Sequence, residues 1–205
     1  MKIVSLKDRR KSLTAVILED GSELLLDSET VIINNLAPGV RLDDPDALVY
    51  ESDLKRAKSR ALWYLSRSDL SEKKLKEKLT QGGFKSDAAE AAVLRMKELG
   101  LINDERLAER LYEYLSSTGA SKKEIIYKLQ NKGIPYQTVK YLAEEDTSDE
   151  SEKVKNLIET KYASKLKDEG GVQKVFAALL RKGYSFSDVR TALKAYTDEQ
   201  IDEEF

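Results

Sequence analysis

A short helical pattern occurs three times in this chain, at intervals of fifty residues. Each copy has two apolar residues four positions apart, a glycine four positions later, and a bulky residue directly after the glycine. The copies run from Leu75 to Phe84, from Ile125 to Ile134 and from Val175 to Tyr184. The apolar pair predicts the buried stripe of a helix, the glycine a left-handed residue that ends it, and the bulky residue a hydrophobic closure of the turn. A repeat of this length indicates a tandem array of helical units.

Two more helices are predicted to complete each unit. The register continues past each glycine into another apolar stripe, and helical spacing precedes each pair over residues 52–66, 104–116 and 152–165. Ser71 and Ser121 are predicted N-caps, and Glu124 completes a capping box with Ser121. The predicted fold class is mainly α: a tandem array of three three-helix modules with a small N-terminal β-hairpin cap. The predicted segments are the cap at 1–50, modules at 51–100, 101–146 and 150–197, and an acidic tail at 198–205.

The first fifty residues have the pattern of a small sheet. Apolar runs at 13–18 and 23–26 flank a Glu-Asp-Gly-Ser turn, which predicts a β-hairpin. A further strand is expected at 3–6, followed by a polar loop at 8–11, and a short helix is expected at 28–35.

The segments between modules differ in polarity. Residues 144–150 are all acidic or hydroxylated, so the third module is expected to hinge there. Residues 99–104 form a short apolar connection, and the first two modules are therefore expected to pack more rigidly.

Composition excludes many kinds of chemistry. The 205 residues include no cysteine and no histidine, which removes thiolate nucleophiles, Cys-based zinc sites and the usual general base near neutral pH. The paired glycines at 82–83 and 170–171 lack the spacing and lysine of a nucleotide-binding loop. We therefore expect no enzymatic activity, no catalytic residues, no cofactor and no metal site, although carboxylate chemistry with Mg²⁺ remains an open alternative. No apolar run is long enough to span a bilayer, so a cytoplasmic protein without membrane contact is expected.

Basic residues concentrate in the first module. Residues 51–100 hold 12 basic and 8 acidic side chains, whereas the whole chain has a net charge of −2. Such residues are most simply a solvated helix surface, and the functional alternative is contact with an acidic partner or a phosphate backbone. The aromatic residues beside them, Trp63 among them, are expected to pack in the core rather than to stack on bases. Tyrosines at 112, 114, 127, 136 and 141 are expected to suit protein contacts if exposed.

The succession of these motifs resembles the RecX family. Residues 61–84 resemble its opening module, residues 100–108 and 128–134 its second block, and residues 180–189 its C-terminal one. The chain departs from the family at Asp69, where members often carry a basic residue, and at Leu107, where they often carry phenylalanine.

The resemblance implies a regulator of the RecA recombinase, with a role in DNA repair, homologous recombination and the SOS response. RecX proteins lie in the groove of the RecA filament on single-stranded DNA and reduce ATP hydrolysis and strand exchange. The chain is expected to act as a monomer, with weak contact to single- or double-stranded DNA. The alternative is a nucleic-acid-binding helical repeat that acts without RecA. The predicted partner-binding residues are Arg60, Arg67, Lys73, Lys74, Lys76, Lys122, Lys123, Lys128, Lys132, Arg181 and Lys182.

Overall fold

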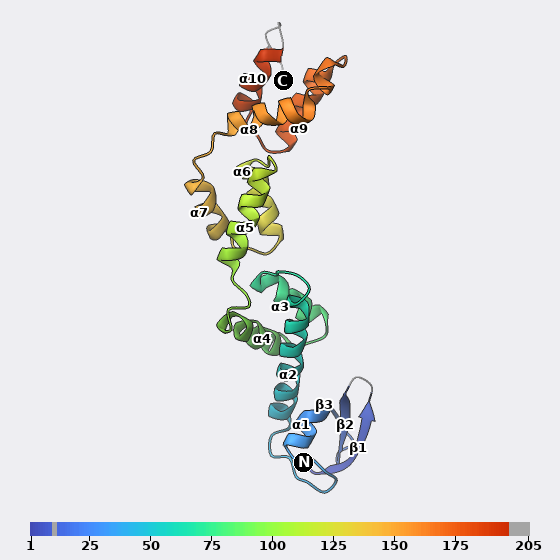
Figure 1. The fold of residues 1–205 in the computed structure, drawn as a ribbon. Coiled ribbons are helices and arrows are strands. Elements are labelled where there is room, and N and C mark those ends of the chain that lie inside the picture. Colours follow the sequence, from blue (N-terminus) through green and yellow to red (C-terminus); the bar gives the residue numbers. More distant parts are fainter. Residues whose placement is uncertain (10–11, 197–205) are drawn as a thin grey trace. The chain divides into compact units, whose positions relative to one another are not determined.

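The computed structural model describes residues 1–9 and 12–196, and these are mainly helical with one small antiparallel sheet (Figure 1). The predicted fold class is confirmed. The chain forms two compact units, residues 1–103 and the part from Asp104 onward. The predicted acidic tail at 198–205 lies outside the described residues.

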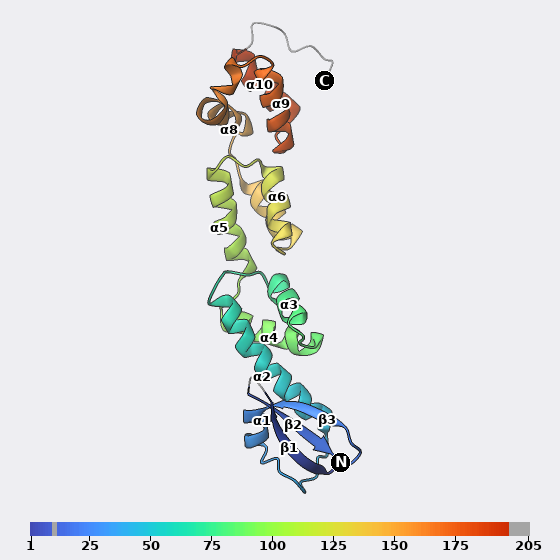
Figure 2. The ribbon, with the colours of Figure 1, turned by 90° about the vertical axis from the view of Figure 1, so that its right-hand side faces the viewer.

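The sheet consists of β1 (Ile3–Arg9), β2 (Leu13–Leu18) and β3 (Glu23–Asp27), paired antiparallel in that order (Figure 2). The predicted hairpin is confirmed as β2–β3, with Gly21 at φ +84° in its turn. β1 is longer than expected, because Asp8 and Arg9 pair with β2 instead of forming a loop. Arg9 also reaches Glu23 on β3 at 3.1 Å, so the charged end of β1 can remain in the sheet with its side chains exposed.

Two helices follow the sheet, α1 (Ser28–Ile33) and α2 (Pro45–Leu65). α2 begins seven residues earlier than predicted, since the Asp44 side chain accepts a hydrogen bond from the Ala47 amide at 2.9 Å and Pro45 occupies the first turn. The buried Ser52 hydroxyl accepts from the Asp27 amide at 2.6 Å. α2 thus crosses residue 50. It packs against the sheet near its start and against the next helices of the chain further along.

The first unit has two apolar clusters. One joins the sheet to α1 and to the loop before α2, and the other joins α2 to α3 (Glu72–Gln81) and α4 (Ser86–Glu98). In the second cluster the predicted stripe residues Leu75 and Leu79 are fully buried against Ala57 and Ala61.

The second unit begins with α5 (Asp104–Ser117), α6 (Lys122–Asn131) and α7 (Tyr136–Glu145). It continues with α8 (Glu150–Leu157), a π-helical turn (Ile158–Tyr162), a 3-10 turn (Lys165–Lys167), α9 (Gly171–Arg181), α10 (Phe186–Leu193) and a final 3-10 turn (Lys194–Tyr196). The helix predicted at 152–165 begins at Glu150, changes to π-helical geometry at Ile158 and ends at Tyr162, and the 3-10 turn follows it. The chain turns there so closely that a Cβ at Gly171 would lie 2.0 Å from the carbonyl oxygen of Lys165.

The glycines of the repeat have the predicted conformation. Gly83, Gly133 and Gly183 have φ values of +91°, +84° and +90°. In each turn the amide of the next residue donates to the carbonyl five residues earlier, as in Ile134 to Leu129 at 3.1 Å. This bond closes the helix end and directs the bulky side chain onto the core.

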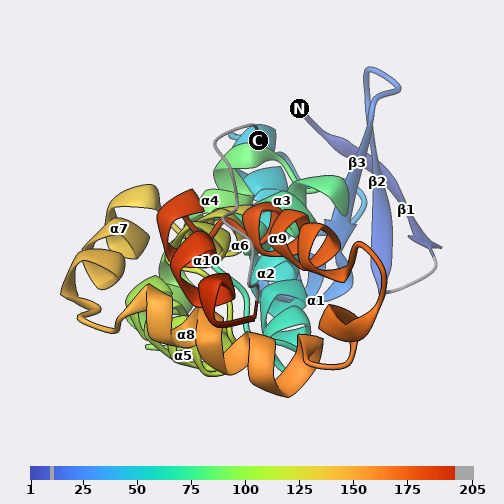
Figure 3. The same ribbon diagram turned by 90° about the horizontal axis from the view of Figure 1, so that it is seen from above.

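α6 contacts the turn between α9 and α10. The Ser121 hydroxyl donates to the carbonyl oxygen of Lys182 at 2.6 Å, and the Tyr184 hydroxyl donates to that of Gly119 at 3.1 Å. α9 and α10 lie side by side in this part of the chain (Figure 3).

The segment predicted as a hinge is anchored at Asp146. This carboxylate accepts hydrogen bonds from the Ser148 amide at 2.8 Å and the Tyr112 hydroxyl at 3.0 Å, and lies 3.4 Å from the Lys153 ammonium. Burial acts to raise the pKa of Asp146, but these hydrogen bonds and the Lys153 charge outweigh it and hold the pKa well below its ordinary value. The division between the compact units falls instead at Asn103, within the connection expected to be the more rigid.

Candidate partner-binding surfaces

The outward side of α2 carries two arginines around one tryptophan. The guanidinium carbon of Arg67 lies 4.3 Å from the centre of the Trp63 ring, and that of Arg60 lies 5.3 Å from it. The three residues occupy neighbouring turns of the helix end, at spacings of three and four. Stacking orders a guanidinium while its N–H groups stay available to carboxylate or phosphate oxygens.

A hollow of about 310 Å³ adjoins this stack. It is lined by Arg56, Ser59, Arg60, Trp63 and Phe84. Arg56 lies over the Phe84 ring at 5.5 Å and pairs with Asp53 at 3.2 Å, so its position is fixed from two sides. We call Arg56, Ser59, Arg60, Trp63, Arg67 and Phe84 the α2 surface.

Core packing is the wrong prediction for Trp63, because 45% of this residue is exposed. Tyr64 does pack against the core, and Lys78 lies over its ring at 5.4 Å. Arg56, Trp63 and Lys78 were not among the predicted site residues. The spacing Arg60-x-x-Trp63-x-x-x-Arg67, with no stripe partner for Trp63, is the signal that identifies the stack.

The predicted lysines of α3 differ in availability. Lys74 pairs with Glu77 at 2.7 Å, and Lys76 pairs with Glu90 on α4. Lys73 is exposed and has no carboxylate within ion-pair distance among the described residues. Of these three lysines, Lys73 is the one that presents its charge to solvent without an ion pair among the described residues.

In the second unit, two predicted cations meet one carboxylate. Glu124 on α6 lies 2.7 Å from Lys128 and 3.6 Å from Lys182. Lys122 is tied to the end of α7, because its ammonium donates to the Asp146 carbonyl while its amide donates to Glu150 at 2.7 Å. Lys122 and Lys182 therefore link α6 to its neighbours, whereas the Lys128 pair lies within α6.

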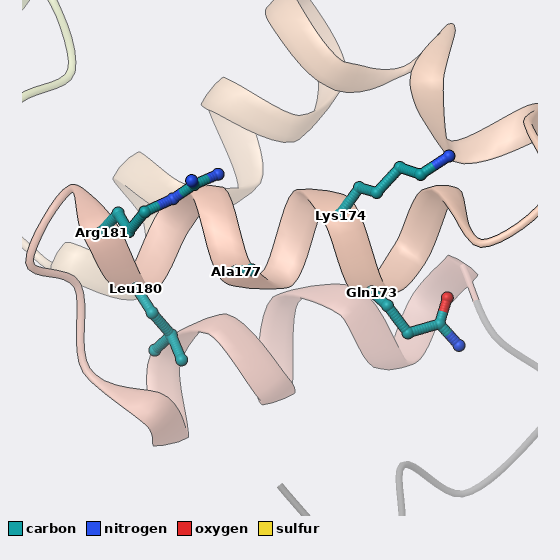
Figure 4. Close-up of a pocket in the computed structure, with 5 residues that line it drawn as sticks. All are labelled: Gln173, Lys174, Ala177, Leu180 and Arg181. Carbon is teal, nitrogen blue, oxygen red and sulfur yellow. The ribbon is translucent and has the colours of Figure 1, made fainter.

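Lys123, Lys132 and Arg181 have exposed side chains. Arg181 belongs to an open hollow of about 590 Å³ on the outward side of α9, lined by Gln173, Lys174, Ala177, Leu180 and Arg181 (Figure 4). The predicted residues therefore differ in exposure, and Lys74, Lys76, Lys128 and Lys182 take part in local ion pairs.

The tyrosines of the second unit are also divided. Tyr114, Tyr127, Tyr136 and Tyr141 are 48–67% exposed, which fits the expected protein-contact surface. Tyr112 is buried instead, and burial, followed by its hydrogen bond to Asp146, raises the pKa of its hydroxyl.

Neither a metal cluster nor a membrane-spanning helix is found among the described residues. Within 1–9 and 12–196, no three histidine, cysteine, aspartate or glutamate side chains gather in a way that suits a metal ion. Among the described helices, none combines the length and apolar content that crossing a bilayer requires.

Comparison with known proteins identifies relatives along most of the chain. Residues 57–96, which include all of the α2 surface except Arg56, match the first three-helix domain of RecX. The regulatory protein RecX of Clostridium perfringens strain 13 is 32% identical over 75% of this chain and 74% of its own length. That of Clostridium perfringens strain SM101 is 28% identical over 97% of this chain and 98% of its own.

Solved structures agree with these sequence relatives. A crystal structure of a regulatory protein RecX shares the fold with a TM-score of 0.63, 23% identity, and coverage of 97% of this chain and 99% of that one. The crystal structure of RecX from Lactobacillus salivarius has a TM-score of 0.60 and 26% identity, and covers 70% of this chain and 96% of that one. The chain belongs to the RecX family of regulatory proteins.

Proposed function

We propose that this chain regulates the RecA recombinase by binding in the groove of the RecA filament on single-stranded DNA, and that the α2 surface is its principal contact in the first unit. Family membership supports the regulatory role. The observation that carries the choice of surface is the Arg60–Trp63–Arg67 stack, which combines exposure, positive charge and order.

The charges of the two stacked arginines are not paired within the described residues, unlike that of Arg56, which pairs with Asp53. Neither Arg60 nor Arg67 has a carboxylate within ion-pair distance among the described residues, whereas Arg95 on α4 pairs with Glu98 at 2.9 Å. An acidic partner can therefore bind the two stacked arginines without first breaking an ion pair. Because each stacked guanidinium is already ordered, less conformational entropy is lost on binding.

Regulation would follow from differential binding. A protein that contacts neighbouring RecA protomers changes their activity only if it binds one filament state more tightly than another. On this proposal the chain needs no catalytic residues and no cofactor, and it acts in the cytoplasm as a monomer. Lys73, Lys123, Lys132 and Arg181 are the further contact candidates, since their side chains are exposed.

The test compares the wild-type chain with two variants, in which arginines are replaced by glutamine, in an assay of RecA activity. Wild-type chain should lower the rate of ATP hydrolysis and of strand exchange by RecA on single-stranded DNA. The double variant Arg60→Gln/Arg67→Gln should require roughly tenfold more protein for the same effect, because each lost charge-assisted contact is worth on the order of 1 kcal/mol.

The matched control is Arg95→Gln, which removes an exposed arginine from α4 in the same unit. It should behave like wild type. If wild-type chain leaves both RecA activities unchanged, the proposed function is wrong. If the double variant and the control inhibit equally, the function stands and the α2 surface is not the contact.

A second function is favoured by the same geometry: direct binding of single-stranded nucleic acid without RecA. Stacked guanidiniums suit phosphate oxygens, and an exposed indole can stack on a base. This function predicts submicromolar affinity for single-stranded DNA alone, falling steeply as salt is raised. Weak, salt-insensitive binding would exclude it.

A further inference from the structure

The third repeat has a small residue where the other two repeats have a long side chain. Counting by fifty, Ala177 on α9 takes the place of Glu77 on α3 and of Tyr127 on α6. An open hollow of about 590 Å³ lies at this position, and its lining residues are Gln173, Lys174, Ala177, Leu180 and Arg181 (Figure 4). We call these five residues the α9 face.

In the first repeat, a carboxylate at this position neutralises a cation of the same helix. The Glu77 carboxylate lies 2.7 Å from the ammonium of Lys74, three positions earlier on α3. Lys174 is the counterpart of Lys74, and it donates to the Glu169 carbonyl oxygen at 3.3 Å without a carboxylate in ion-pair distance among the described residues. The α9 face therefore keeps the cation of the first repeat and lacks its anion.

A second cation lies on the other side of the small residue. Arg181 is exposed and also has no carboxylate within ion-pair distance in the described part of the chain. Ala177 is three positions after Lys174 and four before Arg181, the two spacings at which helix side chains meet. Both cations extend from the same edge of the helix, about 10 Å apart along its axis (Figure 4). A carboxylate above Ala177 can therefore contact both, and a bound partner can supply it.

The floor of the hollow favours an acidic side chain over a phosphate group. Ala177 contributes its methyl group, and Leu180 packs partly against the module core while the rest of its side chain faces the hollow. Aspartate and glutamate carry methylene groups behind the carboxylate, which can cover this apolar surface, whereas a phosphate has no carbon atoms to do so. The α9 face thus suits a protein better than a nucleic-acid backbone.

We propose that the α9 face binds an aspartate or glutamate side chain of a protein partner, whose carboxylate pairs with Lys174 and Arg181 as Glu77 pairs with Lys74. The identity of that partner, the RecA filament, rests on the proposed function. The α9 face then adds a contact in the second unit to that of the α2 surface in the first.

The experiment measures binding of the chain to RecA filaments on single-stranded DNA by co-sedimentation. Ala177→Glu supplies the missing carboxylate within α9 and neutralises both cations, whereas Ala177→Gln fills the same space without a charge. The affinity of Ala177→Glu should be at least about fivefold lower than that of Ala177→Gln, because the two variants differ only in charge. Both new residues are good helix formers and position 177 is exposed, so both variants should fold.

Two further variants complete the comparison. Lys174→Gln/Arg181→Gln should weaken binding about as much as Ala177→Glu does. Asn156→Asp is the matched control, since it adds the same negative charge at an exposed position of α8, and it should bind like wild type.

The outcomes separate this proposal from the proposed function. If wild-type chain binds the filament and Ala177→Glu binds as well as Ala177→Gln, the α9 face is not a carboxylate site, while the proposed function stands. An equal loss of affinity in Asn156→Asp also overturns the proposal, because net charge alone then explains the effect. If Ala177→Glu loses affinity for single-stranded DNA without RecA by the same factor, the occupant is a phosphate and not a protein side chain. Wild-type chain that does not bind the filament refutes the proposed function and the partner assigned here together.

Discussion

The hydroxyl of Ser121 forms two hydrogen bonds, one within α6 and one to a residue sixty-one positions later. It accepts from the Glu124 amide at 3.1 Å as the N-cap of α6, and it donates to the carbonyl oxygen of Lys182 at 2.6 Å. Ser121 is fully buried. The N-cap predicted from sequence is thus also a contact with the turn between α9 and α10.

Substitution of Ser121 should lower the unfolding free energy by more than the loss of an ordinary N-cap does. Ser121→Ala should lower the unfolding free energy of the second unit by about 2–3 kcal/mol, because it removes the cap and leaves the part-buried Lys182 carbonyl without its partner. Ser185→Ala, at the exposed N-cap of α10, should cost about 1 kcal/mol. Urea denaturation followed by circular dichroism measures both, and equal costs would mean that the bond to Lys182 contributes nothing.

Two equivalent glycines should respond differently to alanine. Gly83 and Gly183 have almost the same φ, so alanine at either position pays a strain of about 1–2 kcal/mol. A Cβ at Gly83 meets nothing within 4 Å, whereas a Cβ at Gly183 lies 2.8 Å from the Ser121 oxygen. Gly183→Ala should therefore destabilise its unit by at least about 1 kcal/mol more than Gly83→Ala destabilises the first.

Native-state hydrogen exchange can measure this difference in each unit separately. The amides of Leu79 and Leu179, both in buried helix, are suitable reporters. Similar loss of protection in the two variants would show that the structure accommodates the added methyl group at Gly183.

The Asp146 cluster should make the second unit sensitive to acid. The folded-state pKa of Asp146 lies below its ordinary value of 3.8, so its contribution to stability is complete above about pH 4 and is lost as the pH falls through the folded-state value. Asp146→Asn should remove this acid-dependent part, and Tyr112→Phe should reduce it by deleting one hydrogen bond. Unfolding free energies between pH 2.5 and 6 test this, and parallel curves for wild type and Asp146→Asn would contradict it.

Trp63 should matter more for binding than for folding. Because 45% of Trp63 is exposed, Trp63→Ala should lower the unfolding free energy by only about 1 kcal/mol. It should weaken binding to the partner of the α2 surface by at least about fivefold, since both Arg60 and Arg67 lose the ring that orders them. Thermal unfolding and filament binding measure the two effects, and the neighbouring exposed Leu62→Ala serves as control.

The predicted division into five segments can be tested with fragments. A chain of residues 1–103 should fold by itself, whereas one of residues 104–147 should be destabilised because it lacks Lys153 and Lys182, which contact Asp146 and Ser121. Circular dichroism of the two fragments distinguishes these outcomes. A stable 104–147 fragment would support the predicted boundary near residue 146.

Sequence reasoning worked best where one residue type satisfies one local requirement. A glycine after an apolar helix predicts positive φ, and this was correct at Gly83, Gly133 and Gly183. It failed where the requirement is tertiary. The N-terminal part of α2 lies against the sheet, a contact between segments that the sequence alone does not show, although the Asp44 cap at its start is a local signal.

The candidate surfaces were predictable only in part. The concentration of basic residues indicated α2 and α3, but the sequence could not show that Lys74 and Lys76 pair with Glu77 and Glu90. Nor could it distinguish an exposed tryptophan from a core one, because Trp63 adjoins Tyr64, which does pack inward.

The small space at Gly171 limits how far the three repeats could be given one shared sequence. Its counterparts in the other two repeats are Ser71 and Ser121, and both are helix caps, so a consensus designer would write serine in all three copies. A third serine would put its Cβ 2.0 Å from the carbonyl oxygen of Lys165 and displace the turn that precedes α9. Three identical copies would therefore not rebuild this chain, because each repeat has come to depend on its own neighbours.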